Sequence, residues 1–276
     1  SSTKAGTITY DGGIQNVIAD SYYNLEIDQS GTKTAAGNLS IDGNLVLTGG
    51  ELDFNGGQNI NLKGNLTKTS GSLVNSSSTN GYLVLQGTSG TQTIDAINDQ
   101  EIAIKVSDDA NVTVNGNISA HYVWLQSSNT GTFLIGGWAV SLDDKIVVDG
   151  GTLQITSGSL NTSKNSSSLH ELDGGTIDID GGTVNIGYAT NNTADLNITS
   201  GTIDISGGTL NVSDIRIEMQ KIMQKHAGVF RNDKLLKEGV EKMNNIYKEF
   251  DNVSIDDKDN VFNKIISFSL NLLNSF

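Results

Sequence analysis

The residues best suited to chemistry are carboxylates that recur at similar positions of a repeated phrase. The candidates are Asp173, Asp178, Asp180 and Asp204. Clustered carboxylates are ligands that Ca²⁺ prefers, and a pair of carboxylates also carries out glycoside hydrolysis. No arginine accompanies them, and three of the four fall at the outward polar position of a predicted strand. We therefore expect no catalytic, cofactor-binding or transition-metal residues, and the four carboxylates stay as candidates for calcium.

Other kinds of active site find little support in the sequence. The three histidines, His121, His170 and His226, are not at the spacing of zinc ligands, and there is no cysteine. Neither a Gly-x-Ser-x-Gly motif nor a phosphate-binding loop is present. The Asn-x-Ser/Thr triplets include those at Asn38, Asn65, Asn111, Asn117, Asn197 and Asn211. Several lie within predicted strands, so we expect stacked or solvent-facing asparagines rather than glycan sites.

A short phrase repeats along the chain and predicts its fold. It reads Gly-Gly-Thr-Leu-Gln-Ile at 150–155, Gly-Gly-Thr-Ile-Asp-Ile at 174–179 and Gly-Gly-Thr-Val-Asn-Ile at 181–186, and it returns at 200–205 and 207–212. Apolar and polar residues alternate within each phrase, which is the period of a strand with one buried face. The glycines favour tight corners, because glycine adopts a positive φ without strain.

The spacing of these phrases predicts a parallel β-solenoid, or β-helix, in a mainly β chain. Strands of about five residues joined by sharp corners, recurring every 24 to 26 residues, describe one coil of such a fold. Between residues 37 and 71 glycines recur every six or seven residues, so the same pattern fills the N-terminal part. We expect eight to ten coils, each burying the open face of its neighbour.

The composition divides the chain into two domains near residue 213. Residues 1–212 hold seven lysines and no arginine against 21 acidic residues, whereas residues 213–276 hold ten basic and ten acidic residues. The acidic part argues against nucleic acid and anionic membranes as partners, and no stretch is long and apolar enough for a membrane span. We expect a β-solenoid domain over 1–212 and two or three short helices over 213–276, the first capped by Ser213 or Asp214 with Ile215 on its apolar face.

The aromatic residues of the predicted solenoid permit two interpretations. They are Tyr82, Tyr122, Trp124, Phe133, Trp138 and Tyr188. One interpretation is packing in the core or on a lateral face, and the other is a strip on which sugars stack.

Residues 1–212 resemble β-helical repeat regions of bacterial surface adhesins, of the filamentous-haemagglutinin-like and Bacteroidetes type. The residues that carry this resemblance are Tyr-Tyr-Asn-Leu at 22–25, Gly-Thr-Lys-Thr at 31–34, the stretch 37–45 and the Gly-Gly-Thr phrases. The resemblance implies an extracellular or cell-surface location in a bacterium and a stalk or adhesive role. It implies surface glycans or other surface proteins as partners. Self-association end to end is a further expectation, because an uncovered terminal coil exposes strand edges.

Residues 215–273 resemble the C-terminal helical domain of succinate dehydrogenase and fumarate reductase flavoprotein subunits. The matching stretches are 215–231, 236–243 and Phe262-Asn263. The resemblance implies a helical bundle that packs beside a flavin-bearing body. The family's nucleotide-binding Gly-x-Gly-x-x-Gly motif, its flavin-linking histidine and its substrate-capping domain have no counterpart in this sequence. We therefore carry over no catalytic residue and expect no bound flavin.

The sequence favours one function and keeps two alternatives. The favoured interpretation is a structural or adhesive solenoid segment of a bacterial cell-surface or secreted protein, with no catalysis of its own. The first alternative is a fragment of a succinate dehydrogenase or fumarate reductase flavoprotein subunit fused to a repeat region. The second alternative is a β-helix that binds or cleaves polysaccharides, as lyases and hydrolases with this fold do.

Overall fold

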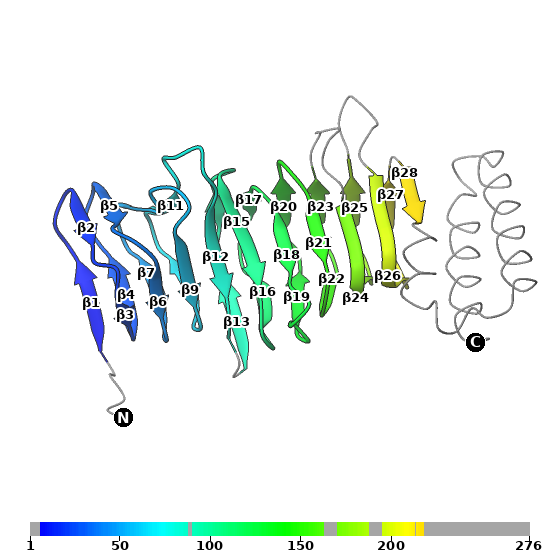
Figure 1. The fold of residues 1–276 in the computed structure, drawn as a ribbon, viewed down its shortest axis with the longest axis horizontal. Helices are drawn as coiled ribbons and strands as arrows, with labels where there is room; N and C mark the ends of the chain where they lie inside the picture. Colours follow the sequence, from blue (N-terminus) through cyan, green and yellow to red (C-terminus); the bar gives the residue numbers. More distant parts are fainter. Residues whose placement is uncertain (1–5, 88–89, 163–169, 188–194, 213, 218–276) are drawn as a thin grey trace, which may run out of the picture. The chain divides into compact units, whose positions relative to one another are not determined.

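The computed structural model describes residues 6–87, 90–162, 170–187, 195–212 and 214–217. All regular elements of these residues are strands, and every pairing between them is parallel. The chain winds as a β-solenoid whose coils lie one beside another from β1 to β28 (Figure 1). The mainly β prediction and the parallel solenoid are confirmed, with a number of coils within the predicted range.

Over most of the fold, each strand pairs with the strand three places further along the chain. Each coil therefore contributes one strand to each of three faces. Face one contains β1 (Thr7–Tyr10), β4 (Asn24–Ile27), β7 (Leu45–Leu47), β10 (Leu66–Lys68), β13 (Thr91–Ile94), β16 (Asn111–Val114), β19 (Thr132–Ile135) and β22 (Thr152–Ile155). Face two contains β3 (Ser21–Tyr22), β6 (Leu39–Ile41), β9 (Asn59–Leu62), β12 (Gly81–Leu85), β15 (Ile102–Val106), β18 (Val123–Leu125), β21 (Ile146–Val148) and β28 (Asp214–Ile217).

Face three is divided into two sheets. The first contains β2 (Gln15–Val17), β5 (Thr32–Ala35), β8 (Glu51–Asp53) and β11 (Ser72–Val74). The second contains β14 (Ile97–Asn98), β17 (Ile118–Ala120), β20 (Ala139–Leu142), β23 (Ser159–Thr162), β25 (Thr183–Ile186) and β27 (Thr209–Val212).

Two long strands, β24 (His170–Ile179) and β26 (Asp195–Ile205), each run from face two onto face one. The register between them shifts on both sides of Asp173, where Gly174 has a φ of 120°. The chain therefore turns this corner without ending the strand. The Gly-Gly pair at 174–175 predicts a tight corner with a positive φ, and the corner lies there. The expected strand length of about five residues is wrong for β24 and β26, which have 10 and 11 residues.

The core consists of aliphatic columns that run across the coils. Register brings Val112, Phe133, Leu153, Ile177 and Ile203 into one column on face one. All five side chains are buried. The alternation seen in the sequence places these residues inside, since successive side chains of a strand point to opposite faces.

Asparagines at the corners link successive coils. The Oδ1 of Asn24 accepts a hydrogen bond from the Asn44 N–H at 2.8 Å, and the Oδ1 of Asn44 accepts one from the Asn65 N–H at 2.9 Å. Asn38, Asn65, Asn111 and Asn117 make the same kind of bond to the next coil. These four asparagines of Asn-x-Ser/Thr triplets are thus stacked, as the sequence predicts.

The solenoid continues past the predicted boundary at Val212. Ile215 lies in β28, opposite Leu196 of β26, and residues 1–217 form one compact unit. The prediction of a helix that begins at Ser213 or Asp214 is wrong at this point, because Ile215-Arg216-Ile217 alternates and extends the edge of β26. The helices expected further along lie outside the described residues. None of the described residues belongs to a helix that is long and apolar enough to cross a membrane.

Candidate functional site

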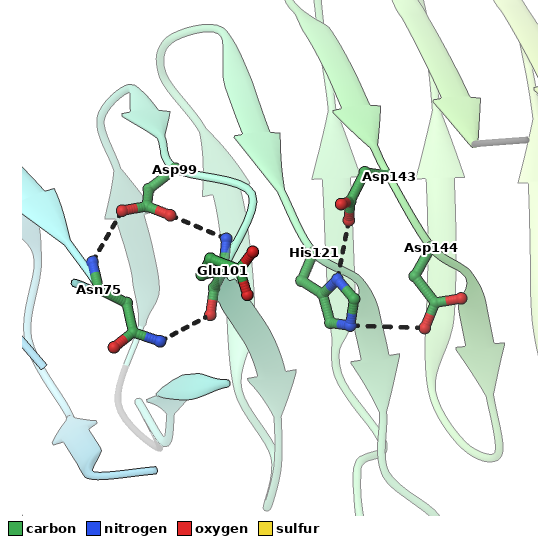
Figure 2. A network of polar contacts seen from close by, with 6 residues as sticks. All are labelled: Asn75, Asp99, Glu101, His121, Asp143 and Asp144. Atoms are coloured by element: carbon green, nitrogen blue, oxygen red, sulfur yellow. Dashed lines mark hydrogen bonds and ion pairs between the residues drawn. The ribbon is translucent and has the colours of Figure 1, made fainter. Parts of the chain in front are cut away.

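A group of polar side chains lies at the corner where face three leads into face two. We call it the polar corner, and it comprises Asn75, Asp99, Glu101, His121, Asp143 and Asp144 (Figure 2). These residues come from four successive coils, at the turns that precede β12, β15, β18 and β21. The same corner recurs in every coil. Residues about one coil apart in sequence therefore lie next to one another in successive coils.

His121 is held between two carboxylates of the next coil. Its Nδ1 lies 2.8 Å from Asp143 Oδ1, and its Nε2 lies 3.6 Å from Asp144 Oδ2. The backbone fixes this arrangement, because the His121 N–H donates to Ile102 O and the His121 carbonyl accepts from the Asp144 N–H. A carboxylate on Nδ1 is the orientation that a general base requires. Here Nε2 also faces a carboxylate, so the group is better suited to holding the corner together than to removing a proton from a substrate.

The neighbouring coil is fixed by Asp99. Its carboxylate accepts hydrogen bonds from the backbone N–H groups of Asn75 at 2.7 Å and Glu101 at 2.8 Å. The side-chain amide of Asn75 donates to the carbonyl of Glu101 at 3.2 Å (Figure 2). Asp99 therefore satisfies turn N–H groups that have no strand partner, which is a structural use of a carboxylate.

Beside the polar corner, face two carries a group that we call the aromatic face: Tyr82, Lys105, Tyr122 and Trp124. The rings of Tyr82 and Tyr122 meet edge to face, with 6.3 Å between their centroids. The Nζ of Lys105 lies 3.8 Å from the centroid of Tyr82 and 5.1 Å from that of Trp124. This is the geometry of cation–π attraction. The His121 ring lies 5.4 Å from that of Tyr122 and connects the two groups.

Two ionisable groups beside these rings are perturbed. Burial raises the pKa of Tyr122 well above its usual value, with further contributions from Tyr82. Burial also raises the pKa of Asp149, although the hydrogen bond of 2.9 Å from Trp124 Nε1 acts in the opposite direction. Both shifts follow from desolvation, which disfavours the charged form.

The four calcium candidates are divided between two places. Asp178 and Asp204 are register partners on face one, and Gln154 donates to both Asp178 at 3.1 Å and Asp180 at 2.9 Å. Asp173 instead accepts a hydrogen bond of 2.9 Å from Ser200 at the corner. Burial, and then the charges of Asp180 and Asp204, raise the pKa of Asp178.

No metal site is preformed in the part of the chain that the structure describes. Among these residues no three His, Asp or Glu side chains are arranged to hold one. Calcium binding by the four carboxylates stays a prediction from sequence.

Sequence reasoning missed the polar corner and the aromatic face as units. The signal was present in the spacing, because His121 precedes Asp143 by 22 residues, about one coil. Aligning the sequence by coils would have brought this pair together. Considered alone, His121 matched no known metal or catalytic spacing.

Comparison with known proteins concerns the C-terminal segment. Residues 216–276 match the family model for the fumarate reductase flavoprotein C-terminal region. One mitochondrial succinate dehydrogenase flavoprotein of Xenopus laevis is 45% identical over 62 residues, which are 22% of this chain and 9% of that protein. The succinate dehydrogenase flavoprotein subunit of Rickettsia bellii is 36% identical over 63 residues, 23% of this chain and 11% of that protein. No solved structure matches.

These comparisons correct the function favoured by the sequence. The matching relatives are succinate dehydrogenase flavoprotein subunits, and no finding supports adhesin repeats. The structural or adhesive role is therefore wrong, and so is the extracellular or cell-surface location, since the Xenopus relatives are mitochondrial. The chain spans about a tenth of the length of the relatives it matches. Its C-terminal segment is thus similar to the end of a flavoprotein subunit, as the first alternative expected.

Proposed function

We propose that this chain is a fragment of a succinate dehydrogenase or fumarate reductase flavoprotein subunit joined to a β-solenoid. In this proposal residues 216–276 recognise the flavin-bearing body of such an enzyme. The observation that carries the proposal is the family match over these residues, together with 45% identity to the Xenopus flavoprotein.

The chemistry of the proposed assembly belongs to the body that the chain recognises. The segment represents 9% of the Xenopus flavoprotein, and the sequence has no Gly-x-Gly-x-x-Gly motif to receive a dinucleotide. The solenoid supplies a rigid unit, because each coil is hydrogen-bonded to the next by parallel strands.

Association with a flavoprotein body tests this function. The full chain is mixed at micromolar concentrations with a succinate dehydrogenase flavoprotein subunit that lacks its own C-terminal segment. Size-exclusion chromatography then follows the visible absorbance of the flavin. We expect the flavin to elute earlier, together with the chain.

The matched control is the full chain with residues 218–276 in scrambled order, which keeps composition, charge and the solenoid. It should leave the flavin peak where it was. Flavin that elutes at the same volume with either chain would overturn the proposal. An absorbance spectrum of the purified chain supplies a second check, because a stoichiometric flavin on the chain alone would contradict the proposal that the flavin belongs to the body that residues 216–276 recognise.

A further inference from the structure

His170 occupies a core position that the neighbouring coils fill with aliphatic side chains. The register on face two aligns Ile104, Val123 and Ile146 in successive coils, and His170 of β24 pairs with Leu196 of β26 further along the same face. All five side chains are buried, and His170 is 0% exposed. A polar ring in an aliphatic column needs hydrogen-bond partners inside the core, because burying a polar group without them is costly.

The partners of His170 come from three successive coils. The N–H of Ile146 in β21 donates to His170 Nδ1 at 3.2 Å, and His170 Nε2 lies 3.4 Å from Thr162 Oγ1 of β23. The same Oγ1 accepts a hydrogen bond of 3.0 Å from the N–H of Gly187, which follows β25. We call His170 and Thr162 the buried clamp. It joins the coil of β23 and β24 to the coils on either side of it, which follow one another in Figure 1.

The buried clamp requires a neutral imidazole. A backbone N–H can only donate, so His170 Nδ1 must offer a lone pair and the ring proton must be on Nε2. The Nε2–H group then donates to Thr162 Oγ1, whose own proton faces the carbonyl of Asn185 at 3.5 Å. A second proton on the ring would set the Nδ1–H group against the N–H of Ile146. It would also place a positive charge in an aliphatic column.

The charged groups on the strands around His170 lie beside the buried column. Asp144 and Lys145 precede β21, and Lys145 Nζ lies 3.9 Å from Glu171 Oε1. Glu171 follows His170 in β24 and so points to the opposite side of the strand. Strand β26 begins with Asp195, whereas β23 and β25 contain no ionisable residue. The Lys145–Glu171 pair is therefore on the outer surface, and the imidazole is inside.

We propose that the buried clamp is a pH-sensitive switch, closed at neutral pH and released in mild acid, which controls how firmly the coil of β23 and β24 is held between its neighbours. An imidazole in an unfolded chain takes up a proton near about pH 6.5. The closed clamp holds His170 neutral, so its contribution to stability is present above about pH 6.5 and declines as the pH falls below it. This inference is independent of the proposed function, because it rests on the solenoid alone.

Hydrogen–deuterium exchange of the full chain at about pH 7.5 and about pH 5.5 tests the switch, since exchange reports local opening. After correction for intrinsic exchange rates, peptides that contain Ile146 and Gly187 should lose protection about tenfold for each pH unit below about pH 6.5. Peptides from β7 and β10 should keep their protection. Their coils are joined through the amides of Asn24 and Asn44, which do not titrate in this range.

His170→Gln is the decisive variant. Its amide oxygen can accept the hydrogen bond of Ile146 and takes up no proton in mild acid, so protection at Ile146 should be the same at both pH values. His121→Gln is the matched control, because His121 contacts Asp143 shortly before β21. It should keep the loss of protection seen in the unmodified chain.

NMR of the imidazole nitrogens in the unmodified chain provides a readout that needs no variant. At about pH 7.5 His170 should be neutral, with its proton on Nε2. A proton on Nδ1 would overturn the inference. So would undiminished protection of Ile146 in acid, the same loss in His170→Gln, a loss abolished by His121→Gln, or an equal loss in β7 and β10.

Discussion

Replacing one corner glycine, Gly182→Ala, should destabilise the solenoid strongly. Gly182 has a φ of 73°, and a Cβ added there would lie 2.5 Å from the carbonyl oxygen of Gly158 in the preceding coil. A left-handed conformation costs an alanine about 1–2 kcal/mol, and forcing atoms into a packed site costs about 1–3 kcal/mol. The two effects together predict a loss of about 2–5 kcal/mol in the free energy of unfolding.

Thermal unfolding followed by circular dichroism measures this loss. For a unit of this size each kcal/mol moves the midpoint by about 2–4 °C, so Gly182→Ala should lower it by about 4–20 °C. Gly136→Ala is the matched control, because a Cβ at Gly136 meets no atom within 4 Å. It should change the stability by less than about 1 kcal/mol. Equal midpoints for the two variants would refute the stacking of residue 182 on residue 158, and with it the described coil register.

Three further perturbations test the core, the face-one carboxylates and the calcium candidates. Phe133→Ala removes a ring that is 0% exposed in the face-one column, and it should cost about 3–5 kcal/mol in chemical denaturation; a loss below about 1 kcal/mol would contradict its place in the core. Asp178→Asn should raise the unfolding midpoint at pH 7, because a carboxyl whose pKa is raised on folding destabilises the fold when it is ionised. The destabilisation disappears as the pH falls through that pKa, so the variant should lose its advantage in acid. A difference in midpoint that grows in acid would contradict the raised pKa of Asp178. Calcium binding by the four carboxylates predicts that millimolar calcium raises the midpoint above its value in chelator, and an unchanged midpoint would remove them as ligands.

Much of the solenoid could be predicted from the sequence, because its rules are local. Alternation places Leu153 and Ile177 inside, and the Gly-Gly phrases place positive φ at Gly182 and Gly208. Both features depend only on residues within one short phrase. The asparagines of the Asn-x-Ser/Thr triplets were expected to be stacked or solvent-facing, but their hydrogen bonds at the corners were not predicted.

The structure departs from the sequence-based predictions where contacts between distant parts of the chain determine the conformation. Lys33 is 0% exposed, and its ammonium group donates a hydrogen bond of 2.7 Å to the carbonyl of Gln29. A lysine between two threonines gives no sign of this, because the carbonyl comes from a turn folded back over the strand. Strand β28 was missed because residues 214–217 gain their strand partners only when β26 lies beside them.

The candidate site was harder to predict than the fold for the same reason. His121, Asp143 and Asp144 are ordinary turn residues in sequence, and the solenoid pitch makes them neighbours. The contact of Lys105 with Tyr82 and Trp124 also joins three different coils. Such groups depend on the register between coils, which alternation within a strand does not specify.

Hydrogen–deuterium exchange of the full chain, with and without the flavin-bearing body of a succinate dehydrogenase, tests the central proposal most directly. Exchange reports which backbone amides become protected on binding. Added protection should fall within residues 218–276, and peptides from β1 to β27 should exchange as before. Protection confined to the solenoid, or no change anywhere in the chain, would contradict the proposal.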